Sequence, residues 1–147
     1  MKGARVRQTF AVVRLDDFKA NVRAVRSLIG DARLMAVVKA DAYGHGLIPV
    51  AHAAEEAGAD WLGVALAEEG VQLRASGIRL PILILAGSNA GETHLAVENG
   101  LTLTVFTPDH VALAQEAALK TGQNVDVHLK LDTGMNRIGV KDEAALG

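Results

Sequence analysis

The chain has 147 residues, half of them hydrophobic, and its 15 Lys and Arg residues against 17 Asp and Glu residues give a formal net charge of −2. This size and composition exclude intrinsic disorder, and the absence of cysteine excludes disulfides, thiolate metal sites and cysteine nucleophiles. A near-neutral charge without a Lys/Arg block, and no apolar run near the roughly 18 to 20 residues of a membrane helix, predict one cytoplasmic domain that binds neither nucleic acid nor membrane.

Apolar runs alternate with amphipathic segments along the sequence. The first helix is expected to begin with Asp16 as its N-cap and to end at Gly30, because Phe18, Val22 and Val25 keep helical spacing. Short apolar runs predict strands at 34–38, 61–65, 81–86, 101–106 and 125–131. Helices are expected between them at 49–57, 67–76, 92–99 and 107–120. This alternation is typical of βα units.

Strands that are joined through helices run parallel, with right-handed crossovers. Two α/β folds satisfy this pattern: a complete doubly wound parallel sheet, or part of a parallel (β/α)8 TIM barrel, which needs about 250 residues. A helix-starting segment at 141–146 stops after roughly one turn and would bury little. It favours an incomplete barrel with about five of its eight strands, so the chain is interpreted as a fragment.

The last predicted strand has two unlike faces. Its apolar residues at 125, 127, 129 and 131 alternate with the polar residues Asp126, His128, Lys130 and Asp132. A strand with helices on both faces of a parallel sheet should instead be apolar on both. The polar face is therefore either a solvated edge, which periodicity alone favours, or a lining of the barrel interior with paired charges.

The first segment with chemical potential is MAVVKADAYGHG at 35–46, where Lys39 follows an apolar strand and precedes a glycine-interrupted loop. α/β barrels place their active sites at the C-terminal ends of strands, and a lysine amine can form a Schiff base with an aldehyde. Spacing alone favours the alternative, a strand-end lysine whose ammonium reaches water. Tyr43 is likewise more often a packing residue, and Gly44 and Gly46 would let the backbone approach a ligand.

The second segment is HLKLDTGMNRIGV at 128–140, where polar residues again gather at the end of a strand. Arg137 suits a carboxylate or a phenolic oxygen, although a single loop arginine is usually solvated. The histidines lack metal-ligand spacing and no serine occupies a GxSxG elbow. The sequence therefore predicts neither a metal site nor a serine hydrolase.

Both segments resemble signatures of the fold-type III pyridoxal-phosphate enzymes, and specifically of the alanine racemases. AVVKADAYGHG at 36–46 is similar to the cofactor-lysine signature of that family, and HLKLDTGMNRIGV at 128–140 is similar to its second signature. The resemblance covers nearly the whole chain and includes an initial strand at 9–15. Related decarboxylases share the fold and a lysine in a similar place, but their motif lacks the AYGHG continuation.

The resemblance implies a role for four residues. Lys39 would form the Schiff base with pyridoxal 5'-phosphate and act as one acid/base on the α-proton, and Tyr43 would hydrogen-bond the cofactor phosphate. Arg137 would contact the substrate carboxylate, and Lys130, which is carbamylated in many members, would be an anion that orients Arg137 inside the barrel. The implied reaction interconverts L-alanine and D-alanine, and supplies D-alanine for the bacterial cell wall.

Family members are more than twice as long as this chain. Residues 1–147 would therefore form the N-terminal portion of the cofactor-binding barrel, without the rest of the barrel, the β-rich C-terminal domain or the second base, which a homodimer partner supplies. Such a fragment alone is expected to be inactive. Two alternatives stay open: a pyridoxal-phosphate-binding barrel protein that does not racemise, and a doubly wound binding module without a covalent cofactor.

Overall fold

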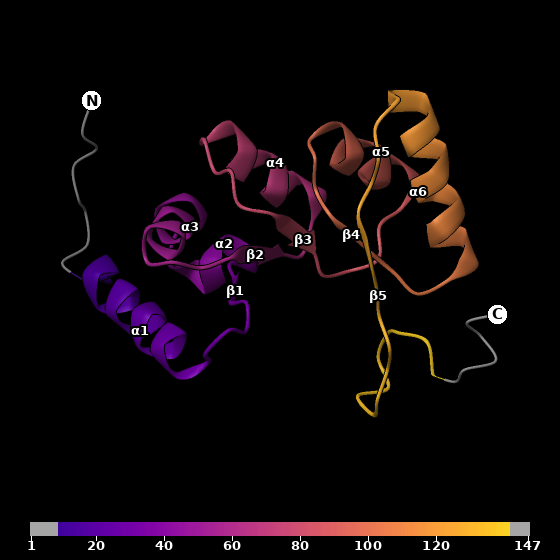
Figure 1. Cartoon of the computed structure of the whole chain (residues 1–147). Helices are drawn as coiled ribbons and strands as arrows, with labels where there is room; N and C mark the ends of the chain where they lie inside the picture. Colours follow the sequence, from indigo (N-terminus) through magenta and orange to yellow (C-terminus); the bar gives the residue numbers. More distant parts are fainter. Residues whose placement is uncertain (1–8, 142–147) are drawn as a thin grey trace.

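The computed structural model describes residues 9–141. Within this part, helices separate the strands along the chain, with two helices between β1 and β2 (Figure 1). The helices are α1 (Leu15–Leu28), α2 (Lys39–Gly44), α3 (Leu47–Glu56), α4 (Ala67–Ala75), α5 (Ala90–Glu98) and α6 (Pro108–Thr121). The strands are β1 (Met35–Val37), β2 (Trp61–Val64), β3 (Ile82–Ile84), β4 (Leu103–Val105) and β5 (Val127–Leu129). The strands and helices predicted between 16 and 131 are therefore confirmed, with ends that differ by a few residues.

The strands pair in the order in which they occur in the chain. β1, β2 and β3 form one parallel sheet, and β4 pairs with β5 in parallel. A parallel bridge between Leu83 and Thr102 joins the two groups, and the Ile84 N–H donates to the Thr102 carbonyl at 2.9 Å. A doubly wound sheet reverses its strand order, whereas a barrel does not. The barrel prediction is therefore confirmed, and the doubly wound alternative is wrong.

The hydrophobic core lies between the strands and the helices. Figure 1 shows α3, α4, α5 and α6 following one another around the outside of the strand row. On this outer side Leu62, Val64 and Ile82 have no exposed surface, which is how helix-covered parallel strands are stabilised. The opposite, inner side is more open, because Val37 remains 39% exposed. The described residues thus form an arc with a covered outer face and an open inner face.

The polar face of β5 is directed to the inside of this arc. The His128 ring lies 5.3 Å from the ring of Trp61 on β2, measured between centroids. The Lys130 Nζ donates to the Leu85 carbonyl, just after β3, at 3.0 Å. Val127, on the opposite face, is 46% exposed. These contacts match the interior lining that a barrel requires and differ from the solvated edge that periodicity favoured.

Two expectations near the start of the chain are wrong. Residues 9–14 form no strand, and α1 begins at Leu15 with Arg14 as its N-cap in place of Asp16. Asp16 and Asp17 lie in the first helical turn, where carboxylates are favourable, and Asp17 pairs with Arg14 at 2.6 Å. The helix signal at 141–146 lies almost wholly outside the described residues. None of the helices among residues 9–141 has the length and apolar character to cross a membrane.

Arg74 of α4 joins neighbouring βα units at the N-terminal side of the strands. Its guanidinium donates to the carbonyls of Ile78 and Leu80 at 3.1 and 2.7 Å, and to those of Asn99 and Gly100 at 3.3 and 3.1 Å. Burial lowers the pKa of this guanidinium from its ordinary value. Arg74 therefore closes two turns that precede β3 and β4.

We expect Arg74→Ala to lower local stability by at least about 2 kcal/mol, because four carbonyls lose a charged donor. Native-state hydrogen exchange of the Ile78 and Leu101 amides, which are bonded to Leu73 and Ala96, measures this loss. The exposed neighbour Arg79 is the control, and Arg79→Ala should change stability by less than about 0.5 kcal/mol. Equal effects of the two substitutions would contradict this role.

Candidate active site

Two of the predicted site residues follow the ends of strands that lie at opposite ends of the arc. Lys39 comes after β1, and Lys130 comes directly after β5. Because the C-terminal ends of parallel strands meet at one edge, both lysines lie at the same rim. This rim is where barrel enzymes place their active sites, so the predicted location of Lys39 and Lys130 agrees with the fold.

Lys39 is followed by a left-handed turn instead of the expected loop. Ala40, Asp41, Ala42 and Tyr43 have φ between 51° and 56°, a conformation that costs L-residues roughly 1–2 kcal/mol each. The turn is closed by the Ala42 N–H, which donates to the Val38 carbonyl at 2.8 Å, and both residues are buried. Strain of this kind persists where the surroundings enforce it, and it is concentrated at functional sites.

The two glycines that follow the turn allow backbone conformations with positive φ. Gly44 and Gly46 have φ of 83° and 98°, which suit glycine best. A Cβ on Gly46 would also lie 3.0 Å from Cγ of Pro49. These two glycines therefore let the chain pass from the left-handed turn into α3, and the close approach to a ligand that the sequence suggested stays a prediction.

Three side chains hold the turn. Asp41 Oδ1 accepts from the Leu47 N–H at 2.6 Å, and His45 Nδ1 lies 2.8 Å from the Ala42 carbonyl. Since a carbonyl only accepts, the imidazole carries its proton on Nδ1 in this contact. Glu69 Oε1 accepts from the Ala40 N–H at 2.6 Å. Glu69 was missed from the sequence, because it lies on another helix and its contact depends on the fold.

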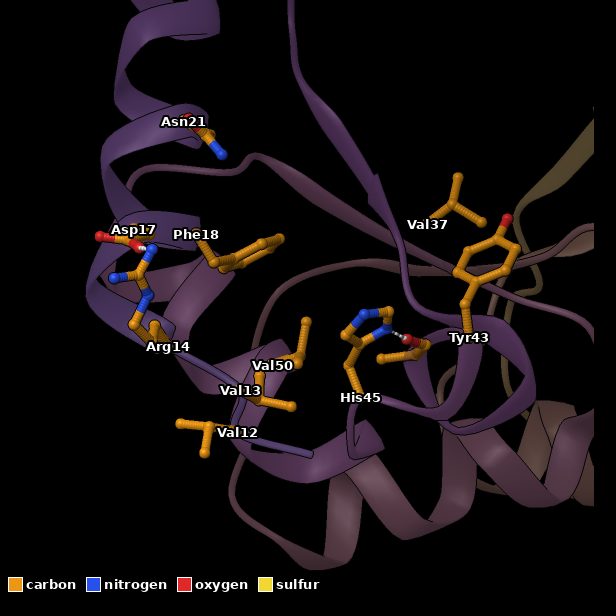
Figure 2. A pocket seen from close by; sticks show the side chains of 11 residues that line it. Val12, Val13, Arg14, Asp17, Phe18, Asn21, Val37, Tyr43, His45 and Val50 are labelled. Carbon is orange, nitrogen blue, oxygen red and sulfur yellow. Dashed lines mark hydrogen bonds and ion pairs between the residues drawn. The ribbon is translucent and has the colours of Figure 1, made fainter. Parts of the chain in front are cut away.

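A pocket of about 510 Å³ lies between this turn and α1. Figure 2 shows the His45 imidazole in the hollow between α1 and the turn, and the Tyr43 ring beside Val37. Tyr43 is 60% exposed, so it is not a packing residue of this chain's core. Lys39 is half-buried, and its side chain does not line this pocket. The pocket thus lies beside the turn that follows the candidate lysine, on the α1 side.

The second predicted segment folds back on itself after β5. The Asp132 N–H donates to the Val140 carbonyl at 2.8 Å, and the Val140 N–H donates to the Lys130 carbonyl at 2.9 Å. A Cβ on Gly139 would lie 2.7 Å from the Asp132 nitrogen, so this close approach requires glycine. Arg137 is exposed on this loop, and no hydrogen bond or ion pair among residues 9–141 joins it to Lys130. Their predicted pairing stays a prediction.

Asp132 shapes the same loop through its carboxylate. Its Oδ1 accepts from the backbone N–H groups of Asn136 and Gly134, both at 3.0 Å. These two bonds hold the pKa of the Asp132 carboxyl below its ordinary value of 3.8. The charged carboxylate therefore stabilises the turn that carries Arg137.

Parallel βα units in sequential order, with a lysine at the end of the first strand, define the first arc of a TIM-barrel enzyme. The profile of the family "Alanine racemase, N-terminal domain" matches residues 13–147. The chain belongs to this alanine racemase family, whose members are isomerases.

Individual relatives agree with this assignment. An alanine racemase of Symbiobacterium thermophilum is 47% identical over 136 residues, which are 92% of this chain and 36% of that protein. The solved alanine racemase of Streptomyces coelicolor A3(2) superposes with a TM-score of 0.85 at 42% identity, over 89% of this chain and 35% of that one. A histidine racemase of Leuconostoc mesenteroides superposes with a TM-score of 0.82 at 33% identity, over 90% and 36% of the two chains. The chain spans about a third of the length of these relatives.

The Asp132 turn should loosen in acid. A lowered pKa in the folded chain means that the stabilisation is present above the ordinary value of 3.8 and is lost as the pH falls through the folded-state pKa. NMR shifts of the Gly134 and Asn136 amide protons, followed from about pH 6 to pH 2, measure this loss. Asp132→Ala should abolish the titration, and Asp126→Ala, at an exposed acid before β5, should not. If the two amide shifts change neither with pH nor on Asp132→Ala, the Asp132 carboxylate does not hold this turn.

Proposed function

We propose that this chain carries the cofactor lysine of a pyridoxal-phosphate-dependent alanine racemase that interconverts L-alanine and D-alanine. The observation that carries the proposal is Lys39, half-buried at the C-terminal end of β1 and followed by the left-handed turn. The family and the alanine racemases among its relatives support it. The activity is proposed for the full-length protein, because the chain spans only part of the length of its relatives.

The groups at the turn suit pyridoxal 5'-phosphate. The side-chain amine of Lys39 has no hydrogen bond or ion pair within residues 9–141, so it is available to hold the aldehyde carbon. Tyr43, four residues further along the turn, offers an exposed hydroxyl that would hydrogen-bond the phosphate. When bound, the cofactor withdraws electrons from the α-carbon of the amino acid and so makes its α-proton acidic.

Lys39 would move the α-proton on one side of the substrate, because a lysine amine at this position can accept and return a proton. Racemisation also needs a second group on the opposite side, which we assign to a part of the protein outside this chain. A homodimer in which the partner supplies that group fits this requirement. The product D-alanine would serve the bacterial cell wall, and a cytoplasmic location stays a prediction.

Lys130 and Arg137 would prepare the substrate side of the site. Lys130 Nζ donates to the Leu85 carbonyl at 3.0 Å, which holds this side chain inside the arc. A carbamate on Nζ would keep one N–H for Leu85 and add a negative charge that attracts the Arg137 guanidinium. Arg137, so oriented, would bind the substrate carboxylate.

In the full-length protein, Lys39→Ala should abolish both the visible absorption of the lysine-bound cofactor and racemisation, because the amine that holds the aldehyde is removed. Absorption spectra and the interconversion of L-alanine, with L-histidine as the comparison substrate, measure these losses. Lys120→Ala is the control, since Lys120 is an exposed residue of α6 that pairs with Glu116. If the visible absorption survives in Lys39→Ala, another lysine holds the cofactor and the proposal is wrong.

Lys130→Ala should lower the racemisation rate by about 10²-fold, because Arg137 loses the anion that orients it. A small added carboxylic acid should restore part of the activity by supplying the missing negative charge. Racemisation rates with and without the acid test this, and the acid should leave the Lys39→Ala variant inactive. A Lys130→Ala variant of full activity would show that Lys130 carries no carbamate of functional importance.

A further inference from the structure

One carboxylate outside the predicted site reaches the residue that directly follows Lys39. Glu69 Oε1 accepts from the Ala40 N–H at 2.6 Å. Its other oxygen, Oε2, accepts from the N–H groups of Ala65 and Leu66 at 2.8 and 3.2 Å. This half-buried side chain therefore joins the segment after β1 to the segment after β2.

Ala40 is the first residue of the left-handed turn, with φ 52°. The bonds from Ala42 to Val38 and from Gly46 to Asp41 close the turn on itself. The bond to Glu69 instead ties its first residue to a separate βα unit. Since a left-handed residue other than glycine needs its surroundings to hold it, this external bond fixes the backbone orientation directly beside Lys39.

Helix capping alone does not account for Glu69. In α5, Glu92 occupies the equivalent place in the first turn, and its Oε2 accepts from the Asn89 N–H at 2.9 Å. The Glu92 N–H returns a bond to Asn89 Oδ1 at 3.0 Å, which completes a capping box confined to that helix. In α4 the corresponding cap residue is Leu66, which has no side-chain acceptor. Glu69 thus caps α4 and also reaches Ala40.

We propose that Glu69 is a positioning residue for the reaction at Lys39. By holding the Ala40 N–H, it sets the direction in which the Lys39 side chain leaves the backbone, and it keeps Tyr43 at a fixed place along the same turn. The inference rests on the proposed function of Lys39. It adds to that function a carboxylate that touches neither substrate nor cofactor and acts through the backbone.

The test uses Glu69→Ala and Glu69→Gln in the full-length protein, with Glu92→Ala and Glu92→Gln as matched controls. The first measurement needs no cofactor: hydrogen exchange at the Ala40 amide should become about 10- to 100-fold faster in Glu69→Ala and stay unchanged in both Glu92 variants. The second is titration with pyridoxal 5'-phosphate, followed by the visible absorption of the lysine-bound cofactor. Its apparent dissociation constant should rise by about tenfold or more in Glu69→Ala alone.

Glu69→Gln decides the case if Glu69→Ala does not fold. Glutamine replaces one carboxylate oxygen by an NH2 group, which cannot accept, and its remaining oxygen is neutral. In either orientation of the amide, the Ala40 N–H therefore loses its acceptor or keeps only a weaker, uncharged one. We expect a folded variant with faster Ala40 exchange and weaker cofactor binding than wild type. Ala40 exchange and cofactor affinity equal to those of the Glu92 controls would overturn the positioning role. Visible absorption that survives in Lys39→Ala would instead overturn the proposed function, whatever the exchange rate of the Ala40 amide.

Discussion

Hydrogen bonding between parallel strands in chain order determines where the two candidate lysines lie. The Val38 N–H donates to the Gly63 carbonyl, and the Lys130 N–H donates to the Val105 carbonyl, at 2.8 and 2.9 Å. These bonds continue the ladders beyond β1 and β5, so both lysines leave the arc at one rim. Residues far apart in the sequence thereby face a common space, which a single βα unit could not arrange.

The two signature segments reach their shapes by different physical means. After β1, ordinary L-residues take up left-handed conformations. Hydrogen bonds that Glu69 and Asp41 accept, and one that His45 donates, offset the cost. After β5, Gly139 permits the backbone to pass close to Asp132. The charged Asp132 carboxylate accepts hydrogen bonds from two N–H groups of the loop. The first segment is held rigidly from outside, whereas the second is organised mainly by its own residues.

The sequence predicted those features of the fold and site that depend on the local pattern of residues. Apolar runs indicated the strands, and strand ends indicated the rim positions of Lys39 and Lys130. The left-handed turn was missed because Ala40 and Tyr43 are not residue types that favour positive φ. Glu69 was missed because its partner is 29 positions away and no local motif marks that contact. The choice between edge and interior for β5 likewise needed the Trp61 and Leu85 contacts, which only the assembled arc provides.

Strand order in this arc is also the order of synthesis. Each strand pairs with the one made just before it, so a nascent chain can add one βα unit at a time without waiting for a distant partner. Each addition leaves a new open edge until the next strand pairs with it. A ribosome that pauses between two units would therefore display an unpaired parallel edge beside uncovered apolar side chains, a surface suited to capture by chaperones.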